Sequence, residues 1–199
     1  MTDLGLMAYF LGIEVKQDEE GIFVSQERYV KEILKKFSVE DCQHVDTPVE
    51  FSIKISKDGE EKAVNPTYYK SLVGCLRYLT CTRPNILFGV SLVSRYMETP
   101  KTSHLQVAKR ILRYIKETTD YGQIYSSSNT MELVGFSDSD WAECCDDYKS
   151  TTRFVFYLGK TVFTWSSKKQ SIVALSTCEA KYIAAASCVC HVVWLRRLL

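Results

Sequence analysis

Two aspartates that follow an apolar run are the residues of this chain best placed for metal chemistry. The run is Leu-Val-Gly-Phe, and Asp138 and Asp140 come directly after it in the segment LVGFSDSDWAE. Paired divalent metal ions, bridged by carboxylates, activate a water and stabilise a leaving oxygen. Each of these hard cations needs several oxygen ligands, so a single aspartate cannot hold the pair. On strand alternation, we expect Asp140 to cap or orient the turn.

Basic side chains on two predicted helices are candidates for contacts with a nucleic-acid backbone. They are Lys31, Lys35, Lys36, Arg110 and Arg113. Lysines are normally exposed on protein surfaces, so a solvated basic face is the favoured interpretation of the three lysines. Binding of nucleic acid by these residues is the alternative.

Cysteine spacing argues against a zinc site or a disulfide framework. The chain has eight cysteines and no C-x-x-C pair. Cys188, Cys190 and His191 are close in sequence, but residues 188 and 190 face different sides of a helix, and zinc needs four convergent ligands. Buried, reduced thiols are the better interpretation. The sequence also lacks a Gly-rich phosphate loop, a G-x-S-x-G elbow and an H-E-x-x-H motif.

Length and composition allow one large or two small domains with an ample core. The chain has 199 residues, 46% of them hydrophobic, and a formal net charge of +1. This charge gives no overall attraction to nucleic acid or membranes. The apolar runs are too short for a bilayer span, and the N-terminal MTDLGLMAYFLGIEV lacks the features of a signal peptide. We therefore expect an intracellular protein, in the cytoplasm or nucleus, with no membrane partner.

Turn and cap signals predict a β-hairpin, a helix and a surface connection in the first third. Residues 9–15 and 22–25 are the predicted strands, around a turn that ends in Gly21, and Ser25 is the predicted cap of the next helix. The apolar face of that helix comprises Val30, Ile33, Leu34 and Phe37. Residues 39–65 show no sustained period and are predicted to be a connection.

The rest of the chain predicts a helical bundle followed by a small sheet. Asn65-Pro66 starts the first of three amphipathic helices, with asparagine as cap and proline at the first helical position. Aromatic and β-branched runs predict strands at 133–138, 152–158 and 161–165. A final helix starts at Ser176, where Ser176-x-x-Glu179 forms a capping box. The predicted fold class is α+β.

Several linked motifs resemble copia-type retrotransposon Pol polyproteins. SDSDWAE, DDYKSTTRFVFYLG, TWSSKKQ and ALSTCEAKYIAA are similar to the ribonuclease H segment of that family. YKSLVGCLRYLTCTRPN and AKRILRYIKET are similar to the stretch just upstream, and YFLGIEV resembles the primer-grip hairpin of the reverse transcriptase. The resemblance implies a reverse transcriptase hairpin and first thumb helix at 1–65 and a helical thumb or connection bundle at 66–120. It implies the N-terminal part of a ribonuclease H-like domain, with three antiparallel strands and one helix, at 121–199.

The resemblance also implies an incomplete pair of active sites. The first of four ribonuclease H acids matches Asp138, but Lys181 stands where the A-E-Y-x-A motif has a glutamate. Arg153 stands where the family usually has a small residue. The other two ribonuclease H acids are expected beyond the WLRRLL segment. The polymerase aspartates are expected upstream of the T-D-L-G motif at residues 2–5. We therefore expect a fragment without catalysis of its own and no cofactor, with Mg²⁺ or Mn²⁺ bound at Asp138 only if some activity remains.

Three other functions remain as alternatives to an inactive fragment. The alternatives are residual hydrolysis of an RNA–DNA hybrid, hybrid binding through the basic residues, and an effector-like role suggested by the Arg-x-Leu-Arg pattern at residues 110–113. Because Leu112 belongs to the core face of a predicted helix, the helical interpretation of that pattern is favoured. Expected partners are an RNA–DNA hybrid or the rest of a Pol polyprotein. Apolar residues within 177–199 also predict self-association.

Overall fold

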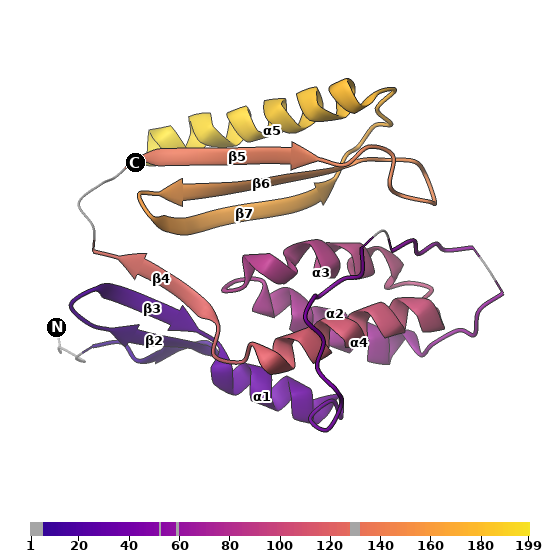
Figure 1. Cartoon of the computed structure of the whole chain (residues 1–199), viewed down its shortest axis with the longest axis horizontal. Coiled ribbons are helices and arrows are strands. Elements are labelled where there is room, and N and C mark those ends of the chain that lie inside the picture. Colours follow the sequence, from indigo (N-terminus) through magenta and orange to yellow (C-terminus); the bar gives the residue numbers. More distant parts are fainter. Residues whose placement is uncertain (1–5, 52, 59, 128–131) are drawn as a thin grey trace. The chain divides into compact units, whose positions relative to one another are not determined.

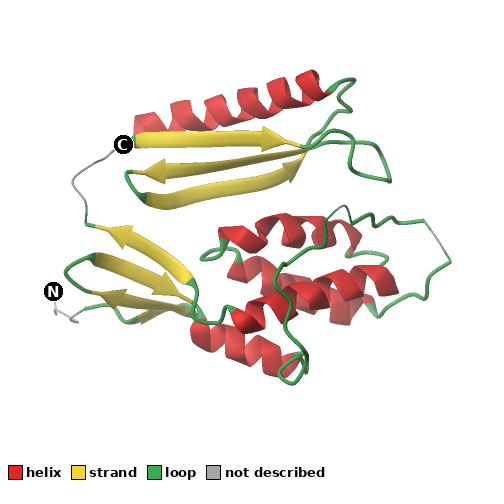
Figure 2. Ribbon diagram, in the orientation of Figure 1, coloured by secondary structure: helices red, strands yellow, loops and turns green. Residues whose placement is uncertain are grey.

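The chain folds as two compact units, each with an antiparallel sheet and helical segments (Figures 1 and 2). The structure, a computed structural model, describes residues 6–51, 53–58, 60–127 and 132–199. The first unit comprises Met1–Ile53 and Glu60–Ser127, and the second Lys54–Gly59 and Ser128–Leu199. The predicted α+β class is confirmed. The T-D-L-G motif lies outside the described residues.

The first sheet contains the predicted hairpin and a strand from far along the chain. Its order is β1 (Tyr9–Phe10), β2 (Ile13–Gln17), β3 (Gly21–Ser25) and β4 (Gly122–Ser126). The single strand predicted at 9–15 is wrong, because Leu11 and Gly12 have positive φ angles of 48° and 82° and reverse the chain. Tyr9 therefore pairs with Glu14.

Strand β4 belongs to the first unit although it follows the helices. It pairs antiparallel with β3, with Gly21 opposite Ser126 and Ser25 opposite Gly122. A predicted boundary at residue 121 thus falls directly before a strand of the first unit. Pairing between segments about 100 residues apart depends on how the helices between them pack, and short-range patterns carry no information about it.

The helices of the first unit pack on the predicted apolar faces. They are α1 (Glu27–Lys36), α2 (Pro66–Leu79), α3 (Leu87–Val93) and α4 (Thr102–Glu117), with short 3₁₀ turns at Pro84–Ile86 and Ser94–Tyr96. Asn65 caps α2 as predicted, since its Oδ1 accepts hydrogen bonds from the backbone of Thr67 and Tyr68. The predicted cap of α1 is wrong: Ser25 is the last residue of β3, and Gln26 occupies the cap position without a side-chain cap bond.

Arg83 is a buried arginine that fastens the end of α4 to the link between α2 and α3. Only 1% of it is exposed. Its guanidinium donates to Thr118 Oγ1 at 3.0 Å and to the carbonyls of Thr119 and Tyr121 at 2.9 and 3.3 Å. A cation at the carboxyl end of a helix also faces the negative end of its dipole. Desolvation lowers the pKa of Arg83, and Tyr114 and Asp120 partly oppose this.

The second unit is a three-stranded meander covered on one face by a long helix. The strands β5 (Leu133–Ser139), β6 (Thr151–Leu158) and β7 (Thr161–Lys169) are antiparallel, and the helix is α5 (Thr177–Leu198). Its core centres on Phe156, Cys188 and Leu195. Three antiparallel strands and one helix are what the sequence predicted here.

The cap of α5 differs slightly from the predicted capping box. Ser176 Oγ accepts from the backbone N–H of Glu179, as expected, whereas Glu179 Oε2 accepts from the N–H of Leu175, one residue before the cap. Glu179 therefore has the structural role that the sequence predicted. By length and composition α5 could cross a membrane, which is weak evidence because core helices of soluble proteins pass the same test.

The predicted connection at 39–65 is divided between the two units. No helix or longer strand interrupts its described residues, as predicted. Residues 54–58, however, pack within the second unit, where Ile55 is buried. The connection is therefore partly a structural component of the second unit.

Candidate functional site

Asp138 lies near the end of β5, on the sheet face that α5 leaves uncovered. In the β5–β6 register Asp138 is opposite Arg153, and Ser137 is opposite Phe154. Phe154 packs against His191 of α5. Because successive side chains of a strand point to opposite faces, Asp138 points away from the helix. Its side chain is exposed.

Asp140 is buried and orients the loop that follows β5. Its Oδ1 accepts a 2.7 Å hydrogen bond from the backbone N–H of Thr151, and its Oδ2 lies 3.6 Å from the Arg153 guanidinium. Only 3% of the Asp140 side chain is exposed, compared with 36% for Arg153. The bond to Thr151 confirms the structural role predicted for Asp140. Arg153 is also the register partner of Asp138, so a cationic residue lies opposite the candidate metal ligand.

The residues around Asp138 do not match what a pair of divalent cations requires. Lys181, at the position expected for the second acid, is exposed on α5 and offers no oxygen ligand. Within the part of the chain that the structure describes, no group of three or more His, Cys, Asp or Glu side chains could hold a metal ion. Among the described residues no set of acids gathers at Asp138, and a single aspartate cannot hold two divalent cations.

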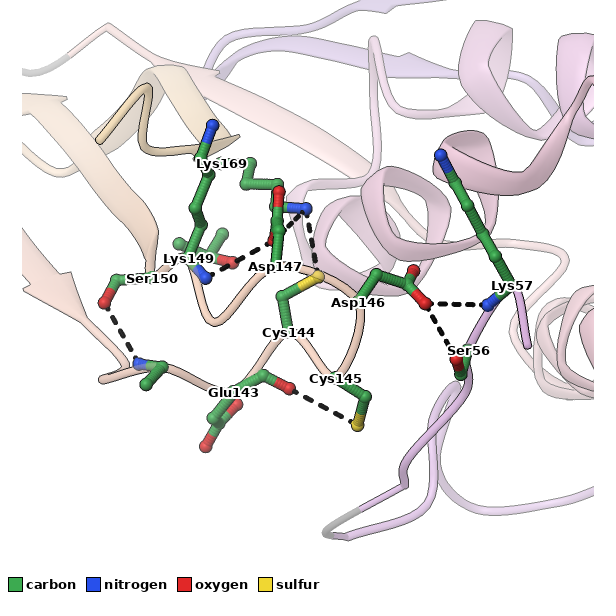
Figure 3. A network of polar contacts seen from close by, with 12 residues as sticks. Ser56, Lys57, Glu143, Cys144, Cys145, Asp146, Asp147, Lys149, Ser150 and Lys169 are labelled. Atoms are coloured by element: carbon green, nitrogen blue, oxygen red, sulfur yellow. Dashed lines mark hydrogen bonds and ion pairs between the residues drawn. The ribbon is translucent and has the colours of Figure 1, made fainter. Parts of the chain in front are cut away.

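A polar network that the sequence did not predict holds the loop between β5 and β6 (Figure 3). Lys169 Nζ, at the end of β7, lies 2.6 Å from Asp147 Oδ1 and 2.9 Å from Cys144 Sγ. On the far side of this loop Asp146 Oδ1 accepts from Ser56 Oγ and from the N–H of Lys57, each at 2.7 Å. In the sequence, only the charged residues of the DDYKS and SKKQ segments hint at such a network. Which of these residues pair depends on how the chain folds.

Opposing effects set the pKa values of this lysine–aspartate pair. Desolvation raises the pKa of Asp147, but hydrogen bonds from Lys169, Cys144 and the Lys149 backbone outweigh it, so the pKa lies below its ordinary value. Desolvation lowers the pKa of Lys169, and its bonds to Asp147 and Cys144 reverse this and raise it. Both groups are therefore charged at neutral pH.

Arg110 and Arg113, two of the candidate nucleic-acid contacts, fasten the connection to α4. Arg110 donates to Glu50 Oε1 at 2.8 Å and to Thr47 Oγ1 at 3.0 Å. Arg113 Nε donates to the carbonyl of Gln43 at 2.8 Å. Between them Leu112 is fully buried. The Arg-x-Leu-Arg pattern is thus part of a packed helix.

The lysines of α1 are more accessible than these arginines. Lys31 forms an ion pair with Glu27 at 2.6 Å, and its side chain is 65% exposed. Lys36 donates to Ser71 Oγ at 3.0 Å, while Lys35 is exposed on the same helix. These positions leave α1 as the better candidate among the predicted basic surfaces.

An open groove lies between α5 and strands β6 and β7. Its volume is about 760 Å³. Its lining includes Phe154, Trp165, Lys168, His191 and Trp194.

Comparison with known proteins identifies the family. Residues 1–51 match the family model described as reverse transcriptase (RNA-dependent DNA polymerase). The chain is 41% identical over 191 residues to the retrovirus-related Pol polyprotein from transposon RE1 of Arabidopsis thaliana, which covers 96% of this chain. The chain belongs to the Pol polyproteins of copia-type retrotransposons.

The Pol segment described here is a small part of its longer relatives. It spans 13% of the RE1 polyprotein. It also matches 80% of an uncharacterized mitochondrial protein of Arabidopsis thaliana, with 37% identity over 98% of this chain. No solved structure matches. The predicted resemblance is confirmed, and the chain corresponds to a fragment of the reverse transcriptase region of Pol.

A further relative carries the effector name that the Arg-x-Leu-Arg pattern suggested. The secreted RxLR effector protein 161 of Plasmopara viticola is 39% identical over 128 residues, which cover 64% of this chain and 90% of the relative. This relative is thus similar to a large part of the same Pol segment.

Proposed function

We propose that this Pol fragment has no polymerase or ribonuclease H catalysis of its own and serves as a non-catalytic structural part of a Pol assembly. The observation that carries the proposal is the ion pair of Arg153 with Asp140, directly opposite Asp138 in the register. The guanidinium offers no lone pair to a divalent cation, and it engages the carboxylate of Asp140. Lys181 adds a second cationic side chain at the position where the resemblance implies an acid.

The test is cleavage of a labelled RNA–DNA hybrid by the full chain with Mg²⁺ or Mn²⁺. We expect no cleavage above background from the wild type, from Asp138→Asn or from Lys181→Glu, with an active ribonuclease H as positive control. Wild-type cleavage that Asp138→Asn abolishes would overturn the proposal, because it would mean that the missing ligands come from elsewhere, such as a second copy. Cleavage that survives Asp138→Asn would indicate a contaminating nuclease, which repurification would remove.

A second candidate function is weak binding of an RNA–DNA hybrid through α1. The exposed lysines of that helix support it, whereas the contacts of Arg110 and Arg113 with the connection argue for a structural role of those two arginines. Backbone binding of this kind releases counterions and weakens as salt rises. The family relationship makes a hybrid the natural ligand to test.

Fluorescence anisotropy with a labelled hybrid distinguishes the two sets of basic residues. Lys31→Gln/Lys35→Gln/Lys36→Gln is expected to weaken binding about tenfold and to reduce the slope of log affinity against log salt. The matched control is Lys62→Gln/Lys70→Gln, which removes two exposed lysines elsewhere in the same unit. An equal loss in both variants would contradict a specific site on α1.

The effector alternative has weaker support. Leu112 is buried and both arginines of the pattern hold the connection. Use of residues 110–113 as an exposed recognition motif would require α4 to unfold. The similarity to a secreted effector therefore supports shared ancestry of the segment more than a shared entry mechanism.

A further inference from the structure

Helix α5 presents an apolar seam on the side that faces away from its own sheet. Ala180, Ala184, Cys188 and Leu195 pack on the sheet and are at most 7% exposed. At 100° per residue, the opposite side of the helix carries the residues that we call the outer seam. These are Glu179, Tyr182, Ala186, Val189, Val193 and Arg196.

The outer seam is unusually apolar for the solvent side of a surface helix. Tyr182 is 79% exposed, Val189 59% and Val193 45%. The solvent side of such a helix normally carries charged and polar residues, and a helix that is apolar all round is normally buried. From Glu179 to Arg196, successive seam residues are separated by three, four, three, four and three positions, which is the spacing of the a and d positions of a helix pair.

We propose that the outer seam binds the same seam of a second copy of this chain, in an antiparallel helix pair. In that arrangement Tyr182 packs against Val193 and Ala186 against Val189 of the second copy. Glu179 then meets Arg196 at both ends. The centre of this pairing falls between Ser187 and Cys188, which is also the midpoint of α5 (Thr177–Leu198), so the two helices overlap along their whole length, about 33 Å.

Charge and symmetry favour a second copy as the occupant. A twofold interface must be self-complementary, and a seam with an acid at one end, four apolar residues and a base at the other end is complementary to itself only when reversed. Glu179 uses Oε2 to cap Leu175, and Oε1 is the oxygen assigned to Arg196 of the second copy. The small side chain of Ala186 at the centre allows close approach of the helices.

A lipid bilayer fits the seam less well. The opposite side of α5 is packed on β5 and β6, so lipid cannot surround the helix in this fold. Both ends of the helix also carry charged side chains, which are Glu179 and Lys181 near its start and Arg196 and Arg197 in its last turn.

Sedimentation velocity of the full chain over a range of concentrations tests the proposal. The wild type is expected to dimerise, and Val189→Glu to weaken dimerisation at least about tenfold, because it would bury unpaired charges. Val189 is exposed, so folding is expected to survive, which circular dichroism checks. Ser187→Glu is the matched control, since residue 187 is exposed on the groove side of the same helix.

Charge reversal identifies the antiparallel register. Glu179→Lys and Arg196→Glu should each weaken self-association about fivefold by placing like charges together. An equal mixture of the two variants should recover the wild-type affinity, because every end then pairs opposite charges. Glu179→Gln removes the charge but keeps an oxygen that can accept from the N–H of Leu175. It therefore separates the effect of charge on self-association from loss of that hydrogen bond.

Three outcomes would overturn the inference. They are a monomer at all concentrations, a dimer unaffected by Val189→Glu, and a mixture of charge variants no tighter than either alone. Flotation with phosphatidylcholine vesicles covers the membrane alternative: a monomer whose vesicle binding depends on Val189 would assign the seam to lipid instead. The inference concerns assembly, so its failure leaves the proposal about catalysis untouched.

Discussion

The guanidinium of Arg153 lies 3.6 Å from Oδ2 of Asp140, across the ladder between β5 and β6. The same arginine is the register partner of Asp138. Because Asp140 is buried, it depends on Arg153 and the Thr151 N–H for compensation of its charge. The candidate acid Asp138 therefore sits next to an ion pair that serves the fold.

Replacing Asp140 by alanine should destabilise the second unit by about 1–3 kcal/mol, because it removes the partner of a buried N–H and leaves Arg153 without its carboxylate. Urea unfolding followed by tryptophan fluorescence measures this. Asp138→Ala is the matched control, and its exposed side chain predicts a change within about 0.5 kcal/mol. Equal losses in the two variants would contradict the structural role of Asp140.

Replacing Asp147 by asparagine should make the second unit less dependent on pH. The folded pKa of Asp147 is lowered by Lys169, Cys144 and the Lys149 backbone, against the effect of desolvation. Such a group contributes stability above its unfolded pKa of about 4, and this contribution is lost as pH falls through the folded pKa. The stability difference between wild type and Asp147→Asn should therefore be largest at neutral pH and shrink in acid.

Thermal unfolding from pH 2 to pH 8 in matched buffers checks this expectation. The pair is partly exposed, so the difference is expected to be modest and to decrease with salt. Asp58→Asn, an exposed acid of the same unit, serves as control. A difference that grows as pH falls would show that the sign is wrong.

Replacing Arg83 by methionine should destabilise the first unit by at least about 2 kcal/mol, since Thr118 Oγ1 and the carbonyls of Thr119 and Tyr121 would lose their donor. Lysine should not rescue the loss, because a single ammonium cannot reproduce the fork of the guanidinium. Guanidinium chloride unfolding measures both variants. Wild-type stability in Arg83→Lys would indicate that the charge alone matters.

Removing the contacts of Arg110 and Arg113 should loosen the connection without changing hybrid affinity. Arg110→Gln/Arg113→Gln takes away the contacts to Thr47, Glu50 and Gln43. Hydrogen exchange at residues 42–51 is expected to become faster, while α4 stays protected. A large loss of hybrid binding with unchanged exchange would instead support the nucleic-acid role that the sequence offers as an alternative.

Short-range signals in the sequence were enough to predict much of the secondary structure. Asn65-Pro66 starts a helix, and the apolar face of α1 is buried as predicted. The meander from residue 133 and the structural role of Glu179 also follow from neighbouring residues. Such features are local because cap bonds and side-chain periodicity involve residues a few positions apart. The family, too, was recognisable from contiguous motifs.

Contacts between distant residues were decided only by the tertiary structure. The pairing of β4 with β3, the ion pair of Arg153 with Asp140 and the bonds of Asp146 to Ser56 and Lys57 each join separate segments. Arg110 and Arg113 look alike in sequence whether they face solvent, nucleic acid or the connection. Side-chain type sets which bonds a residue can form, and the packing of the whole chain sets which partner it meets.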